Sequence, residues 1–385
     1  METDTMTPLK TILLDRILSK GRITFADFMA ACLYEPGLGY YTSPGRKVGA
    51  EGDFYTSMNV HLVFGRLVAR EICRMWESMG SPGRFDIIEA GAGAGQLAKD
   101  ILDTIAGINL PFYDTLTYCL VEKEPTLKEA QKAKLADHLA RLDWHTPEEL
   151  AEGGSTFSGC LLSNELIDAM PVHLVEMTPA GLMEVYVTAL DGEFGEMLDE
   201  PSTPELAAYL KRLGISLFAG QRAEISLAAI GWLEAAAKAV EKGFVLTIDY
   251  GYPADELYAP MRKNGTLLCY YQHTTEESPY IRVGLQDITS HVNFTALMER
   301  GEELGLHTVW FGEQYRFLLG AGLMEEMLAL EKSGVSETEL IKNRLALKKL
   351  MLPDGGMGDT FKVLIQAKGV DNPQLLCMRD WGKCF

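Results

Sequence analysis

A chain of 385 residues with 47% hydrophobic residues can bury a substantial core, so it is expected to fold as a globular protein. Its formal net charge of −19 argues against a nucleic-acid partner, because contacts with phosphates require a cationic surface. No apolar run approaches the roughly 20 residues that span a bilayer, which argues against a membrane protein.

The start of the chain and the cysteines suggest a cellular location. The first residues carry acids throughout and lack a small-residue cleavage site after an apolar core, so neither a secretory signal nor a transit peptide is predicted. A cytoplasmic location is therefore the expectation. The seven cysteines are dispersed, with no CxxC pair and no zinc-like spacing to histidine, which predicts buried thiols and no metal site.

The N-terminal part combines helices with a glycine-rich and tyrosine-rich loop. Apolar periodicity predicts helices at residues 9–19, 25–32 and 60–79, and "YEPGLGYYTSPGRKVGAEGDFYTS" lies between the second and the third. Glycine-containing loops with aromatic side chains often act as lids, although a plain surface loop is the alternative. The side chains that a lid would contribute are Tyr40, Tyr41, Asp53, Thr56 and Ser57.

Strands and helices alternate in the next part of the chain. The expected strands are residues 86–89, 117–122, 142–145 and 159–163, with helices at 96–105 and 125–139. Strands separated by helical crossovers predict an α/β fold with a parallel, doubly wound, Rossmann-like sheet and helices on both faces. Ligands of such sheets bind beyond the carboxyl ends of the strands.

The second half of the chain has a less regular pattern. "HLVEM" and "LMEVYVTAL" predict a hairpin, while "GFVLTIDYGY", "GTLLCYYQH" and "TFKVLIQAKG" predict strands. Helices are expected at residues 204–213, 224–241, 294–304 and within 323–350. The predicted division is N-terminal helices and lid loop (1–80), first core part (81–178), inserted hairpin and helices (179–242), second core part (243–306), helical accessory region (307–356), and last core strand with tail (357–385).

The stretch "FDIIEAGAGAGQLAKDIL" places Gly91, Gly93 and Gly95 between a strand and a helix. A dinucleotide fingerprint starting at Gly91 would require glycine where Gln96 stands, which weakens a nicotinamide-dependent oxidoreductase as an interpretation. Glycines permit positive φ and let a ligand approach the backbone, and the following helix offers free amides to a carboxylate. Glu89 could hold the ammonium group of the same ligand.

The second strand ends in "LVEKEP", where Glu122 stands in the place that usually presents an acid to a ribose diol. The turn and its two acids suit a compact adenosyl amino acid, S-adenosylmethionine, better than a dinucleotide. Another nucleotide-binding turn and a purely structural turn are the alternatives.

Two later strand ends add polar side chains. "LLSNELIDAMPVH" places Asn164, Glu165 and Asp168 after an apolar strand, and "TIDYGY" places Asp249 at the end of another. Amino-methylating enzymes hold the substrate nitrogen with such residues, although a structural turn would also explain them. "DITSHVNF" contains His291, for which a structural role is slightly favoured over a functional one, and Asn293, which could cap the next helix.

Several ordered motifs carry a resemblance over nearly the whole chain: "YYTSP", "GDFYTSMNVHLVFG", "EAGAGAGQLAKDIL", "SNELIDAMPVH", "TIDYGYP", "DITSHVNF" and "MGDTFKVLIQAKG". Together they resemble the MidA-like family of S-adenosylmethionine-dependent methyltransferases. This chain departs from the usual turn of that family, because Ala92 stands where the family has proline. That family includes a mitochondrial protein-arginine methyltransferase that acts in respiratory complex I assembly. The resemblance implies methylation of arginine on a protein substrate, with a respiratory-complex subunit as one candidate.

This resemblance and the chemistry of arginine suggest roles for the candidate residues. A guanidinium stays protonated at neutral pH, so paired carboxylates are suited to hold one of its edges while the other nitrogen faces the methyl group. The hypothesis assigns the guanidinium to Glu165 and Asp249, with Asp168 and Asp53 as further candidates. The cofactor would be held by Glu89, Gly91, Gly93, Gly95, Glu122, Asn164, Thr56 and Ser57.

Two further questions remain open from the sequence. A binding or assembly protein could keep this fold without turnover, because fold does not establish activity. Residues 317–323 and the apolar stripe of 345–352 could support a homodimer or belong to the core.

Overall fold

The computed structural model describes residues 7–43, 58–152, 156–272, 274–332, 336–351 and 360–379. The chain forms two compact units. The first consists of Met1–Tyr55, Ile167–Gly231 and Gly251–Leu297, and the second of Thr56–Leu166, Trp232–Tyr250 and Met298–Phe385. The six-part division expected from the sequence stays a prediction. Within the described ranges no helix is long and apolar enough to cross a membrane.

The second unit contains a sheet with the strand order β15-β16-β10-β5-β2-β3-β4. The strands from β10 to β4 run parallel, and β15 and β16 are antiparallel to their neighbours. The predicted Rossmann-like α/β fold is therefore confirmed. The strand bounds are β2 (Phe85–Ala90), β3 (Leu116–Val121), β4 (Leu142–His145), β5 (Phe157–Asn164), β10 (Val240–Tyr252), β15 (His307–Glu313) and β16 (Phe361–Lys368).

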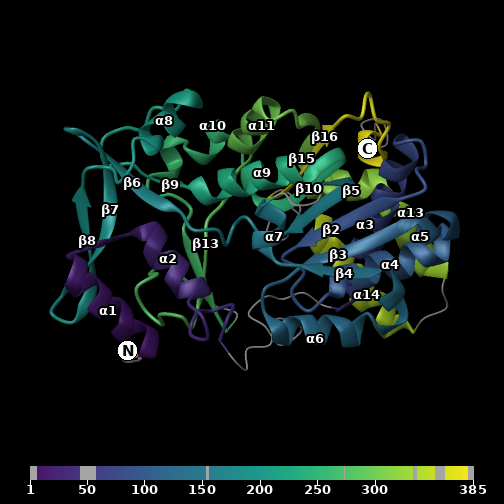
Figure 1. The fold of residues 1–385 in the computed structure, drawn as a ribbon, viewed down its shortest axis with the longest axis horizontal. Helices are drawn as coiled ribbons and strands as arrows, with labels where there is room; N and C mark the ends of the chain where they lie inside the picture. Colours follow the sequence, from purple (N-terminus) through teal and green to yellow (C-terminus); the bar gives the residue numbers. More distant parts are fainter. Residues whose placement is uncertain are drawn as a thin grey trace. The chain divides into compact units, whose positions relative to one another are not determined.

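Helices pack against this sheet through a large apolar core. Figure 1 shows α3 and α4 side by side over the strands, and a Cβ atom on Gly65 of α3 would lie 2.4 Å from Cβ of Asp100 on α4. Glycine at this position therefore lets the two helices approach closely. The helix bounds are α3 (Met58–Ser78), α4 (Gln96–Ile108), α5 (Leu110–Thr115), α6 (Pro125–Lys134), η1 (Ala136–Arg141), α7 (Pro147–Glu152) and η3 (Leu376–Met378). Two further helices, α9 (Leu227–Ala239) and α11 (Phe294–Glu303), have residues in both units.

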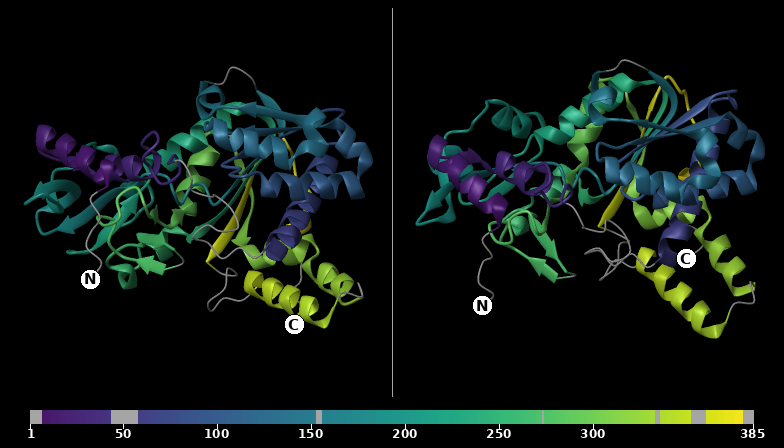
Figure 2. Two further views of the ribbon diagram at one scale, coloured as in Figure 1. Left: turned by 90° about the horizontal axis from the view of Figure 1, so that it is seen from below. Right: turned by 60° about the horizontal axis from the view of Figure 1, so that its bottom comes forward.

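Three C-terminal helices complete the second unit: α12 (Gln314–Ala321), α13 (Leu323–Lys332) and α14 (Glu337–Met351). Figure 2 shows them in yellow-green beside the dark blue α3. Phe317 and Leu323 are fully buried in the core, whereas Leu345 is 57% exposed. Residues 317–323 therefore serve the core of the unit itself.

The first unit contains two antiparallel sheets of its own. One has the order β1-β7-β6-β9 with β8 paired to β7, and the other has the order β12-β11-β13. Figure 1 shows α1 and α2, in purple, beside β7. The bounds are α1 (Pro8–Lys20), β1 (Ile23–Thr24), α2 (Phe25–Tyr34), β6 (His173–Thr178), β7 (Gly181–Leu190), β8 (Glu193–Asp199), α8 (Glu205–Arg212), β9 (Arg222–Ile225), α10 (Ala254–Leu257), η2 (Pro260–Arg262), β11 (Leu268–Tyr271), β12 (Thr274–Glu276), β13 (Asp287–Thr289) and β14 (Val292–Asn293).

Most predicted elements are present, but several differ, among them the helix expected at 125–139, which ends at Lys134. The helix expected at 224–241 begins only at Leu227, because Glu224 belongs to β9 and pairs with Leu174 of β6. "GTLLCYYQH" does form a strand, β11, but that strand joins the three-stranded sheet. The sequence analysis missed β15, an edge strand that pairs only with β16 and is mostly half-buried, so its apolar pattern is weak.

Candidate functional site

The predicted site residues of the second unit gather at one edge of its sheet. Because β2, β3, β5 and β10 are parallel, their carboxyl ends lie at the same edge. Ala90 at the end of β2 pairs with Ser163 of β5, and Asn164 at the end of β5 pairs with Ile248 of β10. The glycine turn, Glu122 and Glu165 directly follow β2, β3 and β5, whereas Asp249, expected at a strand end, lies within β10 beside the turn of Glu165.

The glycine turn has the backbone that was predicted for it. Gly91, Gly93 and Gly95 have φ angles of 77°, 51° and 78°, a region that favours glycine. The Gly95 amide donates to the Ala92 carbonyl over 2.8 Å, and α4 begins at the next residue. The first amides of α4 therefore follow a tight turn, as an anion-binding helix terminus requires.

Gly91 is required for a second reason that the sequence did not reveal. A Cβ atom at this position would lie 3.0 Å from Cδ1 of Leu166, the residue after Glu165. The closest packing at Gly91 is therefore against the turn that follows β5. This contact joins the glycine turn to the segment that carries the predicted substrate carboxylate.

Glu89 is a buried acid directly beneath the turn. Its side chain is 3% exposed, and the Tyr118 hydroxyl donates to its Oε2 atom over 2.7 Å. Burial raises the pKa of Glu89 to about 7, the Tyr118 hydrogen bond opposes this, and the nearby Asp100 adds to it. No described lysine or arginine pairs with Glu89, so a cationic group of a ligand would favour its ionised form.

We expect Glu89 to make the unliganded protein less stable as the pH rises. Its pKa rises from 4.5 to about 7 on folding, so folding takes up a proton between these values and the stabilisation present at low pH is lost as the pH approaches 7. Glu89→Gln keeps the size and the acceptor for Tyr118. Above pH 7 the variant should be more stable than the parent by up to roughly 3 kcal/mol.

The measurement is urea unfolding of both proteins without cofactor across this pH range. At pH 4.5 the two free energies of unfolding should converge. Glu129→Gln, a change of a 72% exposed carboxylate on α6, is the control. A difference between parent and Glu89→Gln that is the same at every pH would contradict the assignment.

Glu122 follows β3 and is oriented by two neighbours. Its Oε1 atom accepts from the Glu124 amide over 2.8 Å, and its Oε2 atom accepts from Nε2 of Gln131 over 3.3 Å. Burial raises the pKa of this carboxyl group. Sequence reasoning missed Gln131, which is fully buried on α6. The only signal was one amide side chain among the charged residues of "PTLKEAQKAK".

The turn that follows β5 is hydrogen-bonded to Ile248 and Asp249, which lie within β10. Glu165 has a φ of 50°, unusual for a residue with a side chain, and its amide donates to the Ile248 carbonyl over 2.9 Å. Asp249 is 1% exposed, and its two oxygens accept from the amides of Leu166 at 3.2 Å and Tyr250 at 2.9 Å. Asp249 therefore stabilises the backbone that presents Glu165.

Asn164 lies beside this turn. Its Nδ2 atom donates to Oε1 of Glu165 over 3.3 Å, so the two predicted residues contact each other. Left-handed conformations of residues with side chains cost free energy and occur often at functional sites. The Asn164 contact and the two hydrogen bonds of Asp249 stabilise that conformation.

Asp168 belongs to the first unit. It is 4% exposed, and its backbone carbonyl accepts from the Ser290 amide over 3.0 Å. In the same unit, the Tyr41 hydroxyl donates to Asp287 over 2.8 Å, and the rings of Tyr34 and Tyr41 stack at 5.5 Å. Burial, together with the charge of Asp287, raises the pKa of both tyrosines.

The remaining predicted residues are only partly covered by the structure. Asp53, Thr56 and Ser57 lie outside the described residues. Tyr40 packs edge to face with Tyr41, with 5.0 Å between ring centroids. The part of the chain that the structure describes contains no cluster of histidine, cysteine, aspartate or glutamate that could hold a metal ion.

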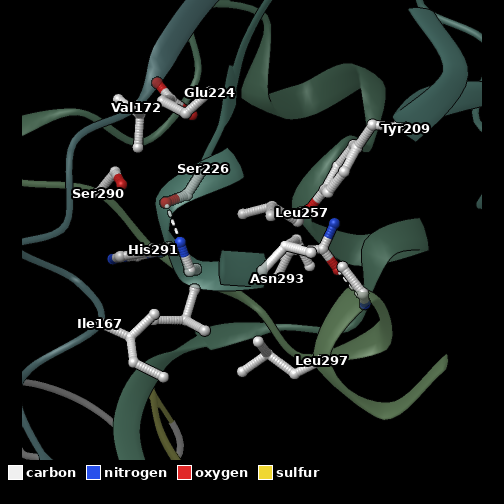
Figure 3. A pocket seen from close by; sticks show the side chains of 14 residues that line it. Ile167, Val172, Tyr209, Glu224, Ser226, Leu257, Ser290, His291, Asn293 and Leu297 are labelled. Atoms are coloured by element: carbon white, nitrogen blue, oxygen red, sulfur yellow. Dashed lines mark hydrogen bonds between the residues drawn. The ribbon is translucent and has the colours of Figure 1, made fainter. Parts of the chain in front are cut away.

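A small cavity in the first unit has a different character. Figure 3 shows Ser226, Ser290 and His291 at its wall together with apolar side chains such as Ile167 and Leu297. Its volume is about 20 Å³, enough for about one water molecule and too small for a nucleoside. Burial lowers the pKa of His291 to about 4, so the ring is neutral at pH 7, in line with a structural role.

The residues at the sheet edge fit S-adenosylmethionine. The glycine turn leads into the start of α4, which has no side-chain cap, and Glu89 and Glu122 offer acids to the ammonium group and the ribose diol. A parallel sheet with this turn after β2 and these two acids beside it is the arrangement expected of S-adenosylmethionine-dependent methyltransferases. Bound S-adenosylmethionine supplies a methyl group activated by its sulfonium sulfur.

Comparison with known proteins gives the family. The model of a family of S-adenosyl-L-methionine-dependent methyltransferases matches residues 67–312. The chain belongs to this family, which is the MidA-like family that the motifs indicated. S-adenosylmethionine is therefore its cofactor.

Relatives and solved structures agree with this assignment. The chain is 27% identical to the mitochondrial protein arginine methyltransferase NDUFAF7 homolog of Drosophila melanogaster, over 92% of this chain and 84% of that protein. The human NDUFAF7 is 26% identical over 92% of this chain and 82% of its own length. A Burkholderia thailandensis protein solved with bound S-adenosyl-homocysteine is 30% identical, with a TM-score of 0.82 and 97% of each chain covered.

Proposed function

We propose that this methyltransferase methylates arginine side chains of a protein substrate. The observation that carries the proposal is the similarity, over nearly the full length, to relatives that are named protein arginine methyltransferases. A carboxylate at the carboxyl end of β5, next to the cofactor turn, agrees with the chemistry that this substrate requires.

Glu165 is the main substrate carboxylate in this proposal. A guanidinium stays protonated at neutral pH, so a carboxylate oxygen of Glu165 would hold one N–H edge and accept the proton that methylation releases. Asp249, whose oxygens accept from the amides of Leu166 and Tyr250, is the second candidate for the guanidinium. Asp168 and Asp53 remain further candidates.

The test uses S-adenosylmethionine with an isotopically heavy methyl group. The purified protein is incubated with this cofactor and an extract of cells that lack the gene, and mass spectrometry locates the heavy methyl groups. Heavy methyl on arginine nitrogens of a protein is the expected result. Heavy methyl on lysine, on carboxylates or only on small molecules, or on no protein, would overturn the proposal, and Glu165→Gln is the negative control.

The proposal extends to partner, location and assembly. The substrate would be a respiratory-complex subunit, as the family resemblance implies, and the same experiment would name it.

We propose a cytoplasmic location, and cell fractionation tests it. The six described cysteines are free and buried, which suits a reducing compartment. A homodimer could use the exposed Ile341 and Leu345 of α14, and sedimentation tests this.

A further inference from the structure

The side-chain amide of Gln131 forms hydrogen bonds with three parts of the sheet edge that carries the cofactor site. Its Nε2 atom donates to the Gly93 carbonyl over 2.7 Å and to Oε2 of Glu122 over 3.3 Å. Its Oε1 atom accepts from Nε1 of Trp144 on β4 over 2.9 Å. The side chain is fully buried, so solvent does not replace these protein partners of its amide. Gln131 therefore connects the glycine turn, the end of β3 and β4.

The orientation of this amide is determined by its partners. The indole N–H of Trp144 can only donate, so the oxygen of Gln131 must face it. The nitrogen must then face the carbonyl of Gly93 and the carboxylate of Glu122, which can only accept. Neither a carboxylate nor an apolar side chain at position 131 could make all three hydrogen bonds.

The groups that Gln131 holds belong to the cofactor site. Gly93 is the middle glycine of the turn, and Glu122 is the acid assigned to the ribose diol. Gln131 also packs beneath the last glycine, because a Cβ atom on Gly95 would lie 3.3 Å from its Cγ atom. Gln131 thus connects the turn and the acid directly, in addition to the pairing of β2 with β3.

We propose that Gln131 is a positioning residue for S-adenosylmethionine, which keeps the carboxylate of Glu122 and the Gly93 turn at the spacing that the adenosyl group requires. It acts through these two residues and does not itself touch the cofactor. The proposal rests on the assignment of Glu122 to the ribose. It is independent of the methyl acceptor, because cofactor binding can be measured without a substrate.

The test measures the dissociation constant of S-adenosylmethionine by calorimetry for Gln131→Met, Glu122→Ala and the double variant. Each single variant should bind roughly tenfold more weakly, the effect of one lost polar contact to a ligand. The losses should be less than additive in the double variant, because part of the effect of Gln131 is exerted through Glu122. In turnover assays Gln131→Met should raise the KM for S-adenosylmethionine and leave kcat at saturating cofactor nearly unchanged.

Gln131→Glu provides a second readout that simple loss of packing would not produce. Its carboxyl group would face the carboxylate of Glu122, so the loss of cofactor affinity should grow as the pH rises and the new group ionises. Glu129→Gln, two residues earlier on α6 and 72% exposed, is the matched control and should bind normally. If Gln131→Met does not fold, Gln131→Asn replaces it in the same comparison.

The possible results distinguish the positioning role of Gln131 from the assignment of Glu122 to the ribose. A folded Gln131→Met with unchanged affinity, beside a weakened Glu122→Ala, would overturn the role of Gln131 alone. Unchanged affinity in Glu122→Ala would overturn the assignment of Glu122 and the proposal with it. Additive losses in the double variant would show that Gln131 does not act through Glu122. None of these results depends on whether arginine is the acceptor.

Discussion

Gly91→Val is expected to lower the affinity for S-adenosylmethionine by on the order of a hundredfold. The native φ of 77° costs a residue with a Cβ roughly 1–2 kcal/mol, and valine adds branched bulk. The new Cβ atom would lie 3.0 Å from Cδ1 of Leu166, so either the turn or the segment after β5 must move. Movement of the turn displaces the amides that face the cofactor.

Calorimetry with S-adenosylmethionine is the measurement, and circular dichroism checks that the variant is folded. Gly107→Val is the matched control, because Gly107 lies in α4 and a Cβ atom there meets no heavy atom within 4 Å. The control should bind the cofactor as the parent does. Normal affinity in a folded Gly91→Val would remove this turn from the cofactor site.

Glu165→Gln is expected to bind S-adenosylmethionine normally and to lose methyl transfer by roughly 10²–10³-fold. Glutamine occupies the same volume and adopts the same φ of 50°, so the turn should keep its backbone hydrogen bond to Ile248. An amide has no negative charge for a guanidinium and cannot accept its proton. Binding and chemistry should therefore separate in this variant.

The assay measures transfer of labelled methyl groups at saturating cofactor, next to a calorimetric affinity. Glu241→Gln changes an exposed carboxylate of β10 that accepts a hydrogen bond from the Thr156 hydroxyl over 3.4 Å, and this variant should retain full activity. If Glu165→Gln turns over at the parent rate, Glu165 does not handle the substrate. If the Glu165→Gln variant loses cofactor affinity instead, the hydrogen bond between Asn164 and Glu165 belongs to the cofactor site.

Local sequence signals predicted the elements that carry the site. The apolar run before Gly91 predicted β2, and the three alternating glycines predicted a turn whose φ angles are all positive. Asn293 was expected to cap a helix, and its Oδ1 atom accepts from the Ala296 amide over 3.1 Å. These features depend on neighbours within a few residues, and the sequence displays them directly.

Contacts between distant residues could not be predicted in the same way. Asp249 binds the amide of Leu166, 83 positions earlier, and so serves the backbone as well as any substrate. Gln131 binds Gly93, 38 positions earlier, although nothing in its own helix indicates a buried role. The direction in which each side chain points depends on the packing of the whole sheet.

The sequence by itself determined the class of fold, the cofactor turn and the acids at the strand ends, because hydrophobic period and glycine conformation are local properties. Only the tertiary structure decided which polar atoms those acids bind. It placed Glu89 against Tyr118, Glu122 against Gln131 and Asp249 against the turn of Glu165. Buried polar groups must find partners, and those partners are brought into reach only when separate strands and helices pack together.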